Sequence, residues 1–418
     1  MSRVLTAVAV VTLLVFNPPF VRADVVLAWN AIATSPLLPA PNGFEGVRRL
    51  AIVQLAVFEA VNSVTGEYEP YLGTVGRTAW ASPDAAAVQA AYDVLKAFYP
   101  SITTPDLDAL LTSSLNQIPE GAAKEAGINI GHAAAAAVLA SRANDGSAMP
   151  GSYVPPFAAK AGEYQLTDGC GAAAFSNWSA VRPFGIPGTS GFILPPPPAL
   201  DSLDYARDYL EVKTVGAADA DLTVRPLDRA NVARFYALTG APYVFGSAAR
   251  QVSWAQQRSL SHNARTLAVM AMAINDSYIV SFATKYTYKL WRPETAIRQR
   301  DYDDGNPLTE RNPDFHTFIF TPCFPSYPSN HASGSRAAAE VLKRAYKEGE
   351  HVIAIENPFV PSISGIKLDY ETFNDICNDV DDARVYGGIH FRFDQTGGNR
   401  LGRAVATYIY KNLLRPVQ

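Results

Sequence analysis

The sequence has 418 residues, of which 48% are hydrophobic and 18% are charged. This composition supplies enough apolar residues for a sizeable core and excludes a globally disordered chain. The formal charge of −4 argues against nucleic acid as a partner, and the length fits one large domain or two ordinary ones.

Residues 1–23 have the pattern of a secretory signal peptide. The positively charged Arg3 precedes a short apolar run over Val4–Phe16, and Ala23 ends a cleavage-like sequence. That run is too short for a membrane span, and we expect no stable span elsewhere. Removing this segment takes away two arginines and no acidic residue, so the formal charge changes from −4 to −6. We therefore expect a secreted protein, periplasmic or extracellular, with 24–418 as its all-helical domain.

Apolar periodicity and turn residues predict helices through most of the chain after the signal. The predicted helices are Phe44–Val64, Pro83–Tyr99, Thr104–Gln117, Glu120–Asn144, Leu200–Val215, Asp228–Leu238, Ala249–Tyr288 with one break allowed, His331–Lys347, Asp369–Val385 and Gly398–Leu414. Between them, Asp145–Pro198 is rich in Gly, Pro and Ser and has no period, which is typical of a lid, a channel wall or a surface excursion. The sequence contains no convincing series of strand patterns, so we predict an all-α fold.

Two of the predicted helical segments resemble each other. Leu50–Glu59 (LAIVQLAVFE) and Leu267–Asp276 (LAVMAMAIND) end in an acidic residue at the matching place. This similarity favours two related helical halves within one domain, over 24–200 and 201–418. The alternative is that any two helices rich in Ala, Leu and Val look alike.

The chain has three cysteines, Cys170, Cys323 and Cys377. In an oxidising compartment one pair can form a bridge and leave one free thiol. The sequence does not fix the pair, and we favour Cys323–Cys377 because it would connect two of the motifs described next. Three free buried thiols are the alternative.

The first of three charged segments contains Lys285 and Arg292. Seven residues are close to two helical turns, so both side chains are expected on one helix face, and Pro293 then ends or kinks the helix. An ammonium beside a guanidinium suits a tetrahedral oxyanion. The alternative is an ordinary solvated basic face.

The second segment, Pro322–Ser335 (PCFPSYPSNHASGS), is a proline-stiffened loop that leads into a helix. Ser329 or Asn330 can cap that helix, and the free N–H groups of its first turn form an anion site. His331 lies at this helix start, where it could transfer a proton to a bound anion. The alternative is a polar histidine with a structural role.

The third segment runs from Arg384 to Asp394. Gly387 and Gly388 break the preceding helix, so His390 begins a new segment. If that segment is helical, Asp394 lies on the same face as His390 and can fix the imidazole tautomer and raise its basicity. The alternative is a helix–helix turn with surface charges. The remaining histidines have no comparable neighbours and are interpreted as structural or surface residues: His132, His262, His316 and His351.

In order and spacing, these segments resemble the signature of the type 2 phosphatidic acid phosphatase and vanadium-dependent haloperoxidase superfamily. Lys-X6-Arg-Pro stands at 285–293. Pro-Ser-Gly-His stands at 328–331 with Asn330 in place of the usual glycine. Ser-Arg-X5-His-X3-Asp stands at 383–394 with Ala383 in place of the usual serine. The residues around the motifs, the length and the long helical N-terminal half are more similar to the vanadium-dependent haloperoxidases than to the phosphatases.

This resemblance implies two helical bundles and a vanadate cofactor. The residues implied to hold the vanadate oxygens are Lys285, Arg292, Ser329, the backbone N–H of Asn330, and Arg384. His390 would bind vanadium directly, and His331 would act as the acid–base. Because Asn tolerates unusual φ and keeps its N–H, we expect Asn330 to preserve binding while adding a donor or narrowing the pocket.

The resemblance further implies that hydrogen peroxide and a halide are the substrates. The product would be hypohalous acid, which halogenates a small organic acceptor. Phe324 and Phe282 are the implied candidates for shaping halide access. Two other functions stay open: an acid phosphatase with His390 as nucleophile and His331 as general acid, and a non-catalytic oxyanion binder. The oligomeric state is not readable, and a homo-oligomer is allowed.

Overall fold

The computed structural model describes residues 24–40, 42–156, 160–299, 303–347 and 349–417, so the predicted signal peptide lies outside the described residues. The α-helices in these ranges are α1 Val25–Ala33, α2 Gly43–Thr65, α3 Pro83–Phe98, α4 Leu107–Asn116, α5 Ala122–Arg142, α6 Leu203–Val215, α7 Leu227–Leu238, α8 Ala241–Ala255, α9 Leu260–Tyr288, α10 Pro293–Arg298, α11 Asn330–Tyr346, α12 Phe373–Tyr386 and α13 Arg392–Asn412. The strands β1 (Ile353–Glu356) and β2 (Lys367–Tyr370) form an antiparallel pair with Ile353 opposite Tyr370. The all-α prediction is confirmed.

The differences from the predicted elements have local causes. The predicted helix Ala249–Tyr288 is two helices, because the chain leaves α8 after Ala255 and the Ser259 side chain caps α9. The predicted helix Asp369–Val385 begins later, at Phe373, since residues 367–370 pair with β1 instead. The short helices α1 and α10 were not predicted.

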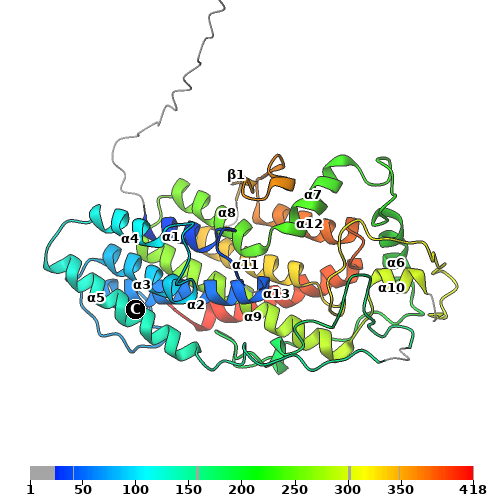
Figure 1. Ribbon diagram of the computed structural model, residues 1–418, viewed down its shortest axis with the longest axis horizontal. Coiled ribbons are helices and arrows are strands. Elements are labelled where there is room, and N and C mark those ends of the chain that lie inside the picture. The colour runs from blue at the N-terminus through cyan, green and yellow to red at the C-terminus, as the bar shows by residue number, and fades with distance from the viewer. Residues whose placement is uncertain (1–23, 41, 157–159, 300–302, 348, 418) are drawn as a thin grey trace, which may run out of the picture.

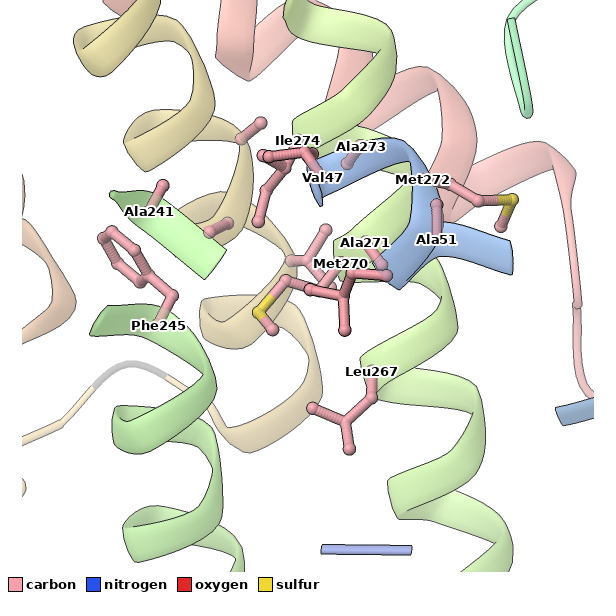
Figure 2. Close-up of a cluster of buried hydrophobic side chains, with 14 of the residues drawn as sticks. Val47, Ala51, Ala241, Phe245, Leu267, Met270, Ala271, Met272, Ala273 and Ile274 are labelled. Carbon is pink, nitrogen blue, oxygen red and sulfur yellow. The ribbon is translucent and has the colours of Figure 1, made fainter. Parts of the chain in front are cut away.

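Helix α9 lies at the centre of the packing. It contacts α2, which packs on α3 and α5, and it also contacts α11 and α13 (Figure 1). By length and composition α9 could cross a membrane, but 94% of its most apolar window is buried inside the protein, as expected for a core helix. Figure 2 shows its side chains meeting those of α2 and α8; the labelled residues are Leu267, Met270, Ala271, Met272, Ala273 and Ile274 of α9, Val47 and Ala51 of α2, and Ala241 and Phe245 of α8.

The irregular stretch between α5 and α6 runs along the lower edge of the molecule in Figure 1. The matching acids of the two similar helical segments hold loops to the core. Asp276 on α9 is fully buried and accepts hydrogen bonds from three successive backbone N–H groups, those of residues 184–186, at 2.7, 2.7 and 3.0 Å. Glu59 on α2 accepts from the backbone N–H groups of Tyr71 and Gly73. Residues 184–186 of the irregular stretch are therefore fixed to α9.

We expect Asp276→Asn to lower the free energy of unfolding by about 2–3 kcal/mol, because an amide NH₂ group cannot accept from the backbone N–H groups it would face. Urea denaturation measures this change. Asp228→Asn removes an exposed carboxylate on α7 and should change the free energy by less than about 0.5 kcal/mol. Equal stability of D276N and wild type would show that the carboxylate does not anchor the stretch.

Candidate active site

The three charged segments meet because α9, α11, α12 and α13 pack together. A pocket of about 400 Å³ forms where they meet. Five of the predicted site residues line it: Phe324, Asn330, His331, Arg384 and His390. The others are fully buried, and their contacts place them beside this lining: Lys285, Arg292, Ser329 and Asp394.

Lys285 and Arg292 reach the site in a way that differs from the prediction. Helix α9 ends before Lys289, which adopts a left-handed φ of 51°, so the expectation that both side chains share one helix face is wrong. Lys285 Nζ donates to the carbonyl groups of Pro325 at 2.8 Å and Ser326 at 2.7 Å. The ammonium group thus fixes the proline-rich loop in front of α11.

Arg292 lies in extended backbone just before α10 and connects two segments of the site. Its Nε donates to the Phe324 carbonyl at 2.7 Å, and its Nη1 donates to the Ile389 carbonyl at 3.0 Å. Nη1 also lies 2.9 Å from His390 Nε2. Because a guanidinium only donates, Nε2 must be the unprotonated nitrogen of the imidazole, and its lone pair accepts this hydrogen bond. A lone pair on Nε2 is what a metal ligand requires.

The other ring nitrogen of His390 is held by Asp394, as predicted. Nδ1 lies 2.8 Å from Asp394 Oδ2, and the same oxygen accepts from Ser326 Oγ at 2.6 Å and from the Phe391 N–H at 3.0 Å. His390 precedes α13 whereas Asp394 is in its first turn, so the contact forms across the helix start and not along one helix face. This arrangement fixes the tautomer with the proton on Nδ1.

Ser329 is the N-cap of α11. Its backbone is extended (φ −70°, ψ 125°), and its Oγ accepts from the Ala332 N–H at 3.3 Å. Asn330 is the first residue of the helix, so of the two predicted caps Ser329 is confirmed. The hydroxyl proton of Ser329 remains able to donate to another group.

Burial makes positive charge unfavourable throughout the site. It is the main cause that lowers the pKa of Lys285, lowers that of Arg292 to about 10 and lowers that of Arg384 to about 9. Repulsion from Arg292 lowers the pKa of Lys285 and Arg384 further. Asp394 is the acidic group within this cluster, and burial raises its pKa to about 6. Positive charge therefore exceeds negative charge in a buried region.

The pKa values of both histidines are also lowered. Burial lowers the pKa of His331, and Arg384 adds to the effect, although a hydrogen bond to the Tyr236 backbone opposes it. Burial followed by repulsion from Arg292 and Lys285 lowers the pKa of His390. The predicted rise in His390 basicity is therefore wrong, since burial and the nearby cations outweigh Asp394. Both imidazoles are neutral near pH 7 in the free protein.

Buried donors without an acceptor identify what the site can hold. Arg292 Nη2 and Arg384 Nε have no hydrogen-bond partner among the described residues, and the same is true of Asn330 Nδ2. A buried charge is costly unless it is paired. Excess positive charge together with unpaired N–H groups fits a tetrahedral oxyanion such as vanadate or phosphate.

Aromatic rings form one wall of the pocket. Phe324 lines it, with its ring centroid 5.2 Å from Lys285 Nζ and 5.0 Å from Arg292 Cζ. Phe282 lies behind Phe324, at 5.3 Å between ring centroids, and is fully buried. Phe44 of α2, which was not predicted, lines the pocket and packs on Phe282 at 4.7 Å. Of the two predicted aromatic residues, Phe324 is thus the one that faces the pocket.

Residues 265–418, which carry all the predicted ligands, match the family of VCPO second helical-bundle domains. The resemblance to the vanadium-dependent haloperoxidases is confirmed. The chain is also similar to the vanadium chloroperoxidase of Curvularia inaequalis, with 27% identity over 173 residues. That match covers 31% of this chain and 28% of the relative.

Two solved structures of bacterial proteins resemble this chain over nearly its whole length. A vanadium-dependent iodoperoxidase has a TM-score of 0.73 and 19% identity, and the match covers 95% of this chain and 96% of that chain. A holo-type vanadium-dependent chloroperoxidase has a TM-score of 0.71 and 18% identity, with 91% and 94% covered. At these identities the likeness establishes the helical fold.

The disulfide differs from the favoured pairing. Cys170 in the irregular stretch is bonded to Cys323, with a Cα–Cα distance of 5.5 Å. Cys377 is a free thiol buried in α12, so the expected Cys323–Cys377 bridge is wrong, as is the alternative of three free thiols. The bridge attaches the irregular stretch to Cys323. The next residue, Phe324, accepts a hydrogen bond from Arg292 through its carbonyl group.

We expect Cys170→Ala to lower the free energy of unfolding by about 2–4 kcal/mol, because the bridge closes a long loop in the unfolded chain. Urea denaturation without reductant measures the change. Cys377→Ala is the control, because it removes the buried free thiol and keeps the bridge. Reductant should lower the stability of C377A as much as it lowers that of wild type. If reductant leaves the stability of wild type unchanged, the bridge does not stabilise the fold.

Proposed function

We propose that the protein is a secreted, vanadate-dependent haloperoxidase that oxidises a halide with hydrogen peroxide to hypohalous acid. The observation that carries this proposal is the excess of buried positive charge around the pocket, with unpaired N–H groups on Arg292 and Arg384. The names of the similar proteins favour vanadate over phosphate as the anion. The Cys170–Cys323 disulfide and the signal-like N-terminus support secretion.

In this proposal each residue has a defined task. Lys285, Arg292 and Arg384 hold the anion and withdraw negative charge from its oxygens, an electrostatic effect that is strong in a buried site. His390 would hold vanadium through Nε2, while Asp394 keeps the proton on Nδ1. Vanadate held by these residues would supply the chemistry by which hydrogen peroxide oxidises a halide, with no change in the oxidation state of vanadium.

His331 supplies the acid–base function. Its imidazole is neutral in the free protein because burial and Arg384 lower its pKa. A bound anion raises the pKa of a neighbouring imidazole, so His331 can take up a proton when the site fills and return it during turnover. The aromatic wall that includes Phe324 limits the access of water and halide to the anion.

The test compares two activities of the same preparation. Peroxide-dependent bromination of a phenolic dye is measured with and without added vanadate, and hydrolysis of a phosphomonoester is measured in parallel. We expect bromination that requires vanadate, peroxide and bromide together. Hydrolysis of the ester without bromination would instead favour an acid phosphatase that uses His390 and His331. Inactivity in both assays despite anion binding would indicate a non-catalytic oxyanion binder.

A further inference from the structure

Asn330, which replaces the glycine usual in the motif, brings a polar side chain into the pocket. It is the first residue of α11 and lines the pocket together with His331, Arg384 and His390. It is 4% exposed. A glycine at this position offers its backbone N–H alone, whereas asparagine adds an amide with two further donors.

A serine on the central helix determines how that amide is turned. Ser281 Oγ donates to Asn330 Oδ1, and Ser281 is completely buried in α9. Ser281 lies four residues before Lys285, so the two side chains project from the same face of α9. The amide oxygen of Asn330 therefore faces α9, and its Nδ2 points away from Ser281.

The amide nitrogen is left without a partner by this arrangement. Asn330 Nδ2 is buried and makes no hydrogen bond to any of the described residues. A buried N–H group without an acceptor is unfavourable and rare. Arg292 Nη2 and Arg384 Nε, at the same site, are also buried and make no hydrogen bond to any described residue. A single oxyanion in the pocket would give all of these groups an acceptor.

We propose that the Asn330 side chain is an additional neutral hydrogen-bond donor to the bound oxyanion, with Ser281 as the positioning residue that directs its Nδ2 into the pocket. This inference rests on the proposed oxyanion site but not on halogenation. It gives this chain a donor that the glycine of the usual motif cannot supply. The added donor strengthens binding of tetrahedral anions and leaves the charge of the site unchanged.

Isothermal titration of the full chain with inorganic phosphate, and separately with orthovanadate, tests the proposal. Asn330→Ala keeps the backbone N–H and should weaken binding of both anions about tenfold, the effect of losing one hydrogen bond to a charged group. Asn330→Asp places a carboxylate beside the anion and should weaken binding by more than about 100-fold. Binding by N330A as tight as that of wild type, or tighter, would overturn the proposal, since the side chain would then merely narrow the pocket.

Variants of α9 test the positioning role. Ser281→Ala removes the contact to Oδ1 and should weaken phosphate binding about threefold, while Ser281→Thr keeps a hydroxyl and should restore it. Ser277→Ala is the matched control, because Ser277 is equally buried one turn earlier and donates to the Ala273 carbonyl. We expect S277A to bind phosphate like wild type. Equal losses in S281A and S277A would overturn the positioning role and indicate a general disturbance of α9.

The outcome for Asn330 is separable from that for the proposed function. If wild type binds phosphate and N330A binds it more weakly, the inference holds even when bromination is absent. If wild type brominates but N330A has unchanged affinity for phosphate and vanadate, the proposed function stands and the inference fails. Thermal unfolding of each variant without anion confirms that it is folded before titration.

Discussion

Replacing His390 with alanine is expected to reduce vanadate-dependent bromination by at least about 1,000-fold. His390 is the imidazole whose Nε2 lone pair faces Arg292 at the pocket, while Nδ1 is fixed by Asp394. Removing it deletes the proposed bond to vanadium. Losing a residue that acts directly on the reacting centre commonly costs several orders of magnitude. The measurement is the initial rate of dye bromination at saturating vanadate.

Phosphate binding separates a lost ligand from a collapsed site. Lys285, Arg292 and Arg384 remain in H390A, so its affinity for phosphate should fall by less than about tenfold. His132→Ala is the control, because His132 is an exposed residue of α5 that contacts Asp93. We expect H132A to retain wild-type bromination. Retention of more than a tenth of the wild-type rate by H390A would contradict its role as the vanadium ligand.

Arg384→Met is expected to have opposite effects on anion binding and on stability. The Arg384 side chain is buried, its Nε has no partner among the described residues, and burial with repulsion from Arg292 lowers its pKa to about 9. Arg384 Nη1 donates to the Tyr236 carbonyl at 3.2 Å, but no acidic side chain among the described residues forms an ion pair with Arg384. Methionine removes this buried charge, so in phosphate-free buffer the free energy of unfolding should rise by ~1 kcal/mol. The affinity for phosphate should fall about 100-fold, because a charged hydrogen bond and its attraction are both lost. Urea denaturation and calorimetric titration provide the two values.

A buried arginine with an acidic partner provides the contrast. Arg298 on α10 is 5% exposed, pairs with Glu294 at 2.9 Å and donates to the Phe315 carbonyl at 2.6 Å. Arg298→Met should lower the free energy of unfolding by about 3 kcal/mol, since it leaves Glu294 without this partner. If R384M is destabilised as strongly as R298M and binds phosphate as tightly as wild type, Arg384 has a structural role and does not bind the anion.

The sequence allowed most of the helices and the side chains that gather at the pocket to be predicted, because both depend on regular spacing. Apolar periodicity located most of the long helices to within a few residues, although α8 begins at Ala241 and not at Ala249, and α13 begins at Arg392 and not at Gly398. Motif spacing identified the charged groups that converge at the pocket. The route taken by Arg292 was not predictable from the same spacing. The predicted helix ended at Tyr288, as α9 does, but the spacing of Lys285 and Arg292 did not show that Lys289 would adopt a left-handed conformation and turn the chain off the helix axis before Arg292.

Three other features depend on contacts between distant parts of the chain. Cys170 lies in a stretch without periodicity, so its position near Cys323 had no signal in the sequence. Ser281 was overlooked as one polar residue within an apolar helix, although its place four residues before Lys285 on the same face was readable. Ser326 lay within the quoted motif, but its bond to Asp394 forms where the proline-rich loop meets the first turn of α13. Local spacing thus predicted which groups converge, and tertiary packing decided which atoms face the pocket.

A crystal structure of the protein soaked with orthovanadate tests the central claim most directly. The decisive quantity is the distance between vanadium and His390 Nε2. We predict density for one vanadate in the pocket, with a metal–nitrogen distance of about 2.1 Å, as in other metal–imidazole bonds, and with oxygens contacting Arg292 and Arg384. An anion that lies more than about 3.5 Å from Nε2, or that binds outside the pocket, would contradict the account.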